Sequence, residues 1–508
     1  MAAQVLTETS ILPAITFLLP LLTGTIVFLA RRMGRRFQQW SSVLTAALVT
    51  GMSAWMAYRV LGGVVLTTWS NELRVDALSA LMVVLIGGIG LLASIYSIPY
   101  LVQQGLIRRV GEDIAGRRRR TFYGLLMWFL GTMLWGCVTN NVIMLYVAIE
   151  ATTLTSGLLV AFYWDRRALE AGYKYLMLLT IGITFALFGC VLVYAGAAAT
   201  KQLAGANALL ISDVRNVVQF MPGGTAAIAI AFLVIGFGTK AGIAPFHPWL
   251  PDAHAEAPTP ISVLLSGVMI KMALYAMART VSIFYPAWPQ VTIFMVALGT
   301  FTMMLGVILA LTQNDLKRLL AYSSVSQMGY VLVGIGLGTY LGCYGGLYHL
   351  LNHALCKSLL FMCVGAVIYA TGARKISELG GLRNRMPFTS ACFFLGALAI
   401  AGFPPLNGFW SKLTVYLALA RAGLWWAAVI AILVSIMTMA VMVRAGYRVF
   451  WGERRSSSTP ESSIIEVPAV MWVPMVILAA LCVWLGIDPQ APYPLLDRAA
   501  AVLATLAK

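Results

Sequence analysis

The sequence is poor in charged residues, in histidine and in cysteine. Only 10% of its 508 residues are charged, whereas 60% are hydrophobic. A soluble domain has about 25% charged residues, so this composition argues against a soluble protein. The seven cysteines form no CxxC pair, which argues against a zinc site or an iron–sulfur cluster. The glycine string Gly334, Gly336 and Gly338 has no strand before it, so it does not indicate a dinucleotide-binding loop. We expect no cofactor, no metal and no redox centre in this chain.

Long apolar runs make up most of the chain. Runs of about 20 residues cross the hydrocarbon core of a bilayer when they are helical. The first run, Ile11 to Ala30, is followed by arginines rather than preceded by them, so we interpret it as a retained span and not as a signal peptide. We predict an all-α polytopic membrane protein with about fourteen spans, at residues 11–30, 42–62, 77–100, 121–138, 141–163, 171–197, 225–246, 259–280, 290–312, 318–337, 340–371, 388–421, 423–449 and 468–486.

The net charge of +17 is distributed unequally between the two sides of these spans. Segments after odd-numbered spans contain 22 basic residues, six of them in the expected loop Arg108–Arg120. The other side, which includes the expected loop Ala198–Gly224, contains eight. Because basic loops stay in the cytoplasm, both termini are expected outside it, in the cell inner (cytoplasmic) membrane. The charge therefore indicates orientation in a lipid bilayer and not binding of nucleic acid.

Lysine and arginine differ in where they occur along the chain. All 26 arginines lie in expected loops or at span ends, whereas five of the nine lysines lie within spans: Lys174, Lys240, Lys271, Lys357 and Lys412. Arginine stays charged, but a desolvated lysine can release its proton. Ionisable groups at membrane depth are costly and usually functional. The pattern favours proton transfer, although Lys174 at its span end is equally well explained as a lysine that reaches to the cytoplasmic surface.

Two spans contain helix-breaking residues next to a lysine. Residues Gly238–Pro251 contain three prolines and two glycines beside Lys240, and Ala401–Lys412 repeats the arrangement five spans later. Interrupted helices place ion sites near the midplane of transporters. We therefore expect discontinuous helices in spans seven and twelve and an internal repeat. The expected divisions are 1–120 (spans 1–3), 121–285 (spans 4–8), 286–450 (spans 9–13) and 451–508 (span 14).

Other ionisable residues accompany these lysines. Glu150 is the single charge of its span and is either a structural partner or a functional group. His349, His353 and Lys357 are four residues apart, so they share one helix face. A zinc site there needs a third ligand that is missing nearby, which favours a polar relay. His247 lies in the broken seventh span and His254 follows it. Weaker candidates are Lys174, His254 and Asp315.

Several segments together resemble the antiporter-like subunits of respiratory complex I, membrane-bound nickel–iron hydrogenases, formate hydrogenlyases and Mrp cation/proton antiporters. The segments that carry the resemblance are KAGIAPFHPWLPDAHAEAPTP (240–260), SGVMIKMALY (266–275), DLKRLLAYSSVSQMGY (315–330), HLLNHALCKSLL (349–360) and residues 402–412. The resemblance implies two inverted five-helix repeats. It also implies an ion pair between Glu150 and Lys240, a link through Lys271 with His247 nearby, and a path through His349, His353 and Lys357 to Lys412.

Two functions fit these expectations, and a third class is weighed against them. The first is a proton-translocating subunit of a complex I-type NADH-quinone oxidoreductase or a related hydrogenase complex, driven by electron transfer in partner subunits. The second is a subunit of an Mrp-type Na⁺(K⁺)/H⁺ antiporter, which needs no redox partner. A purely structural membrane scaffold does not require lysine in particular. In the first two cases the partners are other membrane subunits, protons and, for an antiporter, sodium or potassium ions.

Overall fold

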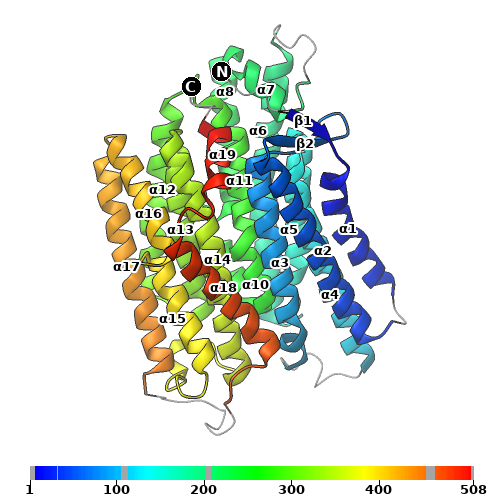
Figure 1. The fold of residues 1–508 in the computed structure, drawn as a ribbon, viewed down its shortest axis with the longest axis vertical. Helices are drawn as coiled ribbons and strands as arrows, with labels where there is room; N and C mark the ends of the chain where they lie inside the picture. The colour runs from blue at the N-terminus through cyan, green and yellow to red at the C-terminus, as the bar shows by residue number, and fades with distance from the viewer. Residues whose placement is uncertain (1–5, 31–32, 104–111, 201–206, 454–463, 505–508) are drawn as a thin grey trace.

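The computed structural model describes residues 6–30, 33–103, 112–200, 207–453 and 464–504. Helices form most of this part of the chain (Figure 1). The helices of the first half are α1 (Leu12–Leu29), α2 (Arg35–Leu61), α3 (Ala77–Gln103), α4 (Glu112–Val138), α5 (Val142–Val160), α6 (Arg166–Ala198), α7 (Ile211–Val217), α8 (Gly223–Ala241), α9 (Trp249–Glu256), α10 (Thr259–Leu264) and α11 (Ile270–Val281). Those of the second half are α12 (Gln290–Leu311), α13 (Leu316–Gly336), α14 (Tyr340–Thr371), α15 (Pro387–Ala401), α16 (Asn407–Arg421), α17 (Trp425–Phe450), α18 (Ala469–Ile487) and α19 (Tyr493–Ala504).

The predicted all-α polytopic fold with fourteen spans is confirmed. Among the described residues, 13 helices are long and apolar enough to cross a membrane. The remaining expected span, 388–421, is divided into α15 and α16. The expected seventh span ends at Ala241 and is continued by the short helix α9. Spans seven and twelve are therefore discontinuous, as their glycines and prolines predicted.

A small three-stranded sheet was not predicted from the sequence. Strands β1 (Leu6–Thr9) and β2 (Val64–Thr68) pair in parallel, and β2 pairs antiparallel with β3 (Leu73–Val75). Strands of three to five residues in an apolar chain leave no alternating pattern long enough to recognise. The sheet and α19 lie at the same end of the molecule (Figure 1), which we call the sheet end.

Two expected loops are partly helical. Arg117–Arg120 lie in α4, which begins at Glu112, and the segment after Ala198 contains α7 and a 3₁₀ turn at Val218–Phe220. Residues 104–111 and 201–206 of these segments lie outside the described residues.

The two five-helix repeats run in opposite directions. Asn141 caps the start of α5 and donates to Glu72 at the sheet end, with Nδ2 and Oε2 2.9 Å apart. Asp315 caps the corresponding helix α13 in the same way, but α13 ends at the sheet end, where Gly338 packs against Tyr285. Equivalent helices therefore have inverted directions across the membrane, as the resemblance implied.

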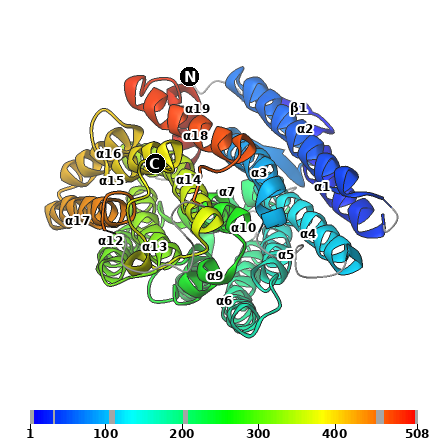
Figure 2. The same ribbon diagram turned by 90° about the horizontal axis from the view of Figure 1, so that it is seen from below.

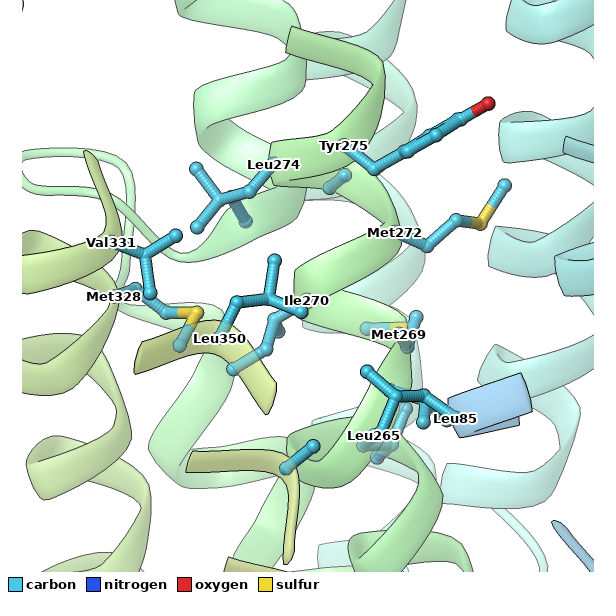
Figure 3. Close-up of a cluster of buried hydrophobic side chains, with 14 of the residues drawn as sticks. Leu85, Leu265, Met269, Ile270, Met272, Leu274, Tyr275, Met328, Val331 and Leu350 are labelled. Atoms are coloured by element: carbon cyan, nitrogen blue, oxygen red, sulfur yellow. The ribbon is translucent and has the colours of Figure 1, made fainter. Parts of the chain in front are cut away.

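The segment formed by α10, the π-helical turn η2 (Leu265–Met269) and α11 lies in the interior of the bundle. All of its most apolar window is buried, and Figure 2 shows α10 beside α14, between the outer helices α1 and α17. Leu265, Met269 and Ile270 belong to the apolar cluster around this segment (Figure 3). This cluster makes the interior largely apolar, so the polar side chains that are buried within it are candidates for a function.

Candidate functional site

Lys240 lies in the last turn of α8, at the first helix break. Gly242, with a left-handed φ of 73°, ends this helix. The side chain of Lys240 is 1% exposed, and its Nζ donates to Thr153 Oγ1 at 2.9 Å. The Tyr175 ring centroid lies 5.6 Å from the same atom. Carbonyls at a helix C-terminus carry partial negative charge, so this end of α8 favours a protonated lysine without a carboxylate in contact.

Glu150 lies on α5, one turn before Thr153. Its Oε1 accepts from Thr180 Oγ1 at 3.2 Å. No ion pair between described residues joins Glu150 to Lys240 directly. Lys240 Nζ contacts Thr153, a residue that the sequence analysis did not identify, rather than the Glu150 carboxylate.

Lys271 is fully buried and follows the π-helical turn η2. Its Nζ donates to the backbone oxygen of Ser266 at 2.6 Å. A π-helical turn interrupts the regular backbone ladder and frees such an oxygen for a side chain. The Ser266 hydroxyl in turn lies 2.8 Å from the Ser324 hydroxyl on α13. Lys271 is thereby connected to the second repeat.

The central helix α14 carries His349, His353 and Lys357, all buried. Lys357 donates to the backbone oxygen of Leu320 at 2.9 Å and to the Ser323 hydroxyl. The rings of His349 and His353 are 6.2 Å apart, as their shared helix face predicts.

The two histidines differ in their partners. His349 Nδ1 lies 3.1 Å from Ser411 Oγ, and its Nε2 lies 3.1 Å from Gln327 Oε1. Within the described residues, neither ring nitrogen of His353 has a hydrogen-bond partner. Both ring nitrogens of His349 thus contact polar side chains, which is the arrangement of a relay.

Lys412 lies at the second helix break and is 2% exposed. Its Nζ donates to Ser435 Oγ at 2.9 Å and to Ala401 O at 3.2 Å, and it lies 4.8 Å from the centroid of the Tyr330 ring. Ala401 is the last residue of α15, before Gly402 with φ 86°. In the sequence, Lys240 precedes its break whereas Lys412 follows its own. The Lys412 ammonium nevertheless returns to the C-terminal end of α15, and Lys240 itself belongs to the last turn of α8.

The four lysines Lys240, Lys271, Lys357 and Lys412 share one property. Their recorded hydrogen-bond acceptors are hydroxyl and backbone oxygens, and no ion pair between described residues includes them. Such partners can accept from a charged lysine without fixing its charge, whereas a carboxylate in contact holds the proton on the amine. We call these lysines, together with Glu150, His349 and His353, the buried polar axis.

The other predicted residues lie beside this axis or at the surface. His247 is buried, with its ring 6.2 Å from Tyr322, and His254 is buried and stacked 4.7 Å from Phe361. Lys174 is half-exposed and pairs with Glu170 at 2.7 Å. Asp315 caps α13 and pairs with Arg374 at 2.8 Å. In this structure Lys174 therefore forms a surface ion pair, and Asp315 caps a helix.

Comparison with known proteins agrees with this arrangement. The family described as "NADH:quinone oxidoreductase/Mrp antiporter, TM" matches residues 139–438, and the family described as "NADH-Ubiquinone oxidoreductase (complex I), chain 5 N-terminus" matches residues 67–109. The NADH-quinone oxidoreductase subunit N of Desulforudis audaxviator is 32% identical over 432 residues, which cover 82% of each chain. A hydrogenase-4 component F homolog of Methylacidiphilum infernorum is 33% identical over 394 residues, covering 77% of this chain and 81% of that protein.

Solved structures show the same fold. One chain of the membrane-bound sulfane sulfur reductase, an archaeal respiratory membrane complex, superimposes with a TM-score of 0.84 at 25% identity, covering 98% of this chain and 99% of that one. The fold and the buried polar axis define an antiporter-like membrane subunit. The chain belongs to the NADH:quinone oxidoreductase/Mrp antiporter membrane-subunit family.

Proposed function

We propose that this chain moves protons along the buried polar axis, from Glu150 and Lys240 through Lys271, Lys357, His353 and His349 to Lys412. The observation that carries the proposal is that four lysines lie within the membrane bundle with only hydroxyl and backbone oxygen acceptors recorded for them. A buried amine without a carboxylate in contact can exist with or without its proton, which a relay requires.

The contacts suggest how a proton would be passed on. Glu150 lies one turn before Thr153, the residue that Lys240 contacts, so movement of the carboxylate would change how strongly that lysine holds its proton. Ser266 and Ser324 connect Lys271 to α13, and Ser323 on the same helix contacts Lys357. His349, with Ser411 and Gln327, lies between Lys357 and the second break. Water molecules would complete the intervals between these groups.

The relatives suggest the assembly. We assign the chain to a complex I-type NADH-quinone oxidoreductase or a related hydrogenase complex in the cell inner membrane, because its relatives are named as a quinone oxidoreductase subunit and a hydrogenase component. Electron transfer in partner subunits would supply the energy and act on the Glu150–Thr153–Lys240 group. The distribution of basic residues supports a cytoplasmic location of the end opposite the sheet, with both termini outside. The divisions 1–120, 121–285, 286–450 and 451–508 serve as the working domain boundaries of this proposal.

Substitution of Lys240 tests the function. Both Lys240→Ala and Lys240→Arg should abolish proton uptake by inverted membrane vesicles while the complex still assembles. Alanine removes the proton carrier, whereas arginine cannot release its proton. The exposed Lys375→Ala is the matched control and should pump normally. Normal uptake by Lys240→Arg would remove Lys240 from the path.

The Mrp-type alternative rests on the family description, which includes Mrp antiporters. An antiporter subunit would exchange sodium or potassium for protons without electron transfer. An imposed sodium gradient in inverted vesicles distinguishes the two functions. Proton movement that follows this gradient, and does not respond to a respiratory substrate, would favour the antiporter.

A further inference from the structure

Two buried asparagines connect α14 to the start of α16. Asn352 Nδ2 donates to Asn407 O at 2.9 Å, and Asn407 Nδ2 donates to Asn352 Oδ1 at 3.1 Å. Both side chains are at most 1% exposed. Asn407 is the first residue of α16, so it follows the second helix break directly. The two amides therefore join the central helix to the broken span at the point where that span becomes helical again.

Helix α18, which lies outside both five-helix repeats, packs behind this pair. The Cys356 thiol of α14 donates to Asn407 Oδ1 at 3.6 Å and lies 3.7 Å from the Cys482 thiol of α18. One turn later in α18, the backbone at Gly486 lies so close to the break that an added Cβ would clash with Pro405 O. Three helices therefore meet at Asn407. With the Cys356 contact, each of the four polar atoms of the two amides has a partner.

The contact between His349 and Ser411 lies one turn from the asparagine pair on both helices. Ser411 follows Asn407 by four residues, and His349 precedes Asn352 by three. Each asparagine therefore shares a helix face with one member of this contact. His349 Nδ1 and Ser411 Oγ are 3.1 Å apart, and Lys412 is the next residue after Ser411. A displacement of α16 along α14 that breaks the asparagine pair would also separate His349 from Ser411.

A pair of amides in an apolar interior favours one alignment of two helices. Apolar side chains can repack after a small slide, whereas a buried amide that loses its partner is left with unsatisfied polar atoms. A single buried asparagine can fix the register of a coiled coil for this reason, and asparagines also bond between helices in membranes. An asparagine amide does not exchange a proton as lysine or histidine does, so these residues would act on the proton path only through the groups that they position.

We propose that Asn352 and Asn407 are positioning residues for the second half of the buried polar axis. With α18 behind them, they set the register of α16 on α14 and so hold Ser411 against His349, beside Lys412. The consequence for transport rests on the proposed function. The position of His349 does not, because it can be measured without transport.

Nitrogen-15 NMR of the histidine rings tests the proposal in the full-length chain in lipid bilayers. The chain has four histidines, so the signals that disappear in His349→Gln identify His349. Asn407→Leu keeps a side chain of similar size but removes the amide, and it should move the His349 Nδ1 resonance because the contact with Ser411 changes. Asn407→Ser keeps a polar group that is too short to reach Asn352. It should move the same resonance even if the leucine variant does not fold.

Asn140→Leu is the matched control, because Asn140 is a buried asparagine whose amide donates to Asn71 O and Ser212 Oγ, away from His349. It should leave the His349 resonances unchanged. In the assembled complex, Asn407→Leu should also lower proton uptake about fivefold, the order expected for one hydrogen bond between membrane helices. Unchanged His349 resonances in both Asn407 variants would overturn the proposal. A moved resonance with wild-type proton uptake would support the positioning role and would count against His349 as a member of the proton path.

Discussion

The buried lysines of the polar axis have different partners from several arginines at the helix ends. Arg279, Arg318 and Arg374 pair with carboxylates at the helix ends. Lysines of the buried polar axis instead donate to hydroxyl and backbone oxygens in the interior. Because a guanidinium does not lose its proton and an amine can, the difference in position corresponds to a difference in chemistry. These arginines connect helix ends through ion pairs, whereas the lysines of the buried polar axis have the chemistry that the proposed proton transfer requires.

Thr153 can be tested by substitution. Thr153→Val keeps the side-chain shape but removes the hydroxyl that accepts from Lys240 Nζ at 2.9 Å. Turnover of proton uptake should fall about tenfold, since a hydrogen bond to a charged group contributes about 1.5–3 kcal/mol. Vesicle acidification measures this rate. Thr155→Val is the control, because both hydroxyls bond the backbone of their own helix, whereas that of Thr153 also contacts Lys240. Equal effects of the two substitutions would argue against a role of the contact with Lys240.

At the scale of the helix, three of the four lysines of the buried polar axis lie at an interruption, and Lys357 lies within the continuous helix α14. Lys240 and Lys412 meet the C-terminal ends of α8 and α15, and Lys271 follows a π-helical turn. An interruption exposes backbone oxygens that a regular helix would use internally. These oxygens provide polar partners within the membrane without introducing a second charge.

Gly402 tests the importance of the second interruption. Gly402→Ala forces an alanine to a φ of 86° and places its Cβ 2.9 Å from Lys412 Cδ. Proton uptake should fall severalfold as Lys412 is displaced, and stability should fall by about 1–2 kcal/mol. Gly423→Ala is the control, since Gly423 has φ 75° and no atom within 4 Å of its added Cβ. It should lose similar stability but keep transport, as measured by thermal unfolding and vesicle uptake. Loss of transport in both variants would mean that strain alone is responsible.

The sequence predicted the two helix breaks, but it did not predict the π-helical turn, the role of Thr153 or the position of the Lys412 side chain. Prolines and glycines at 238–251 and 401–412 predicted both breaks, because they cannot continue a helix. The π-helical turn at Leu265–Met269 contains one glycine, Gly267, and no proline, which is too weak a signal to predict an interruption from the sequence. Thr153 was not identified because its contact with Lys240 on α8 depends on tertiary packing; within its own helix it bonds Ile149 O as an ordinary threonine does. The return of Lys412 to the end of α15 depends on tertiary folding and is invisible in the sequence.

At the scale of the whole molecule, the two inverted repeats place a broken helix and a lysine on each side of the central helix α14. Hydroxyl and histidine side chains on α13 and α14 lie between them. The sheet end also contains α19 (Figure 1), while the proposed cytoplasmic end contains most basic residues. The orientation can be measured directly.

Cysteine labelling tests the proposed orientation. Ser70→Cys places a thiol at the sheet end and Lys375→Cys at the opposite end, both at exposed positions. A membrane-impermeant maleimide should label Ser70→Cys in intact cells and Lys375→Cys only after the membrane is opened. Wild type should react little, because its seven cysteines are buried. The reversed labelling pattern would contradict the orientation.

Substitution of Lys357 tests most directly whether protons cross the membrane through the buried polar axis. Lys357→Met removes the charge from the centre of α14 and keeps an unbranched side chain in an apolar setting. The measurement is the number of protons taken up per electron transferred, in inverted vesicles that contain the assembled complex, with Lys375→Met as control. Lys357→Met should lose proton uptake while electron transfer continues. An unchanged proton-to-electron ratio would show that protons do not need Lys357 to cross.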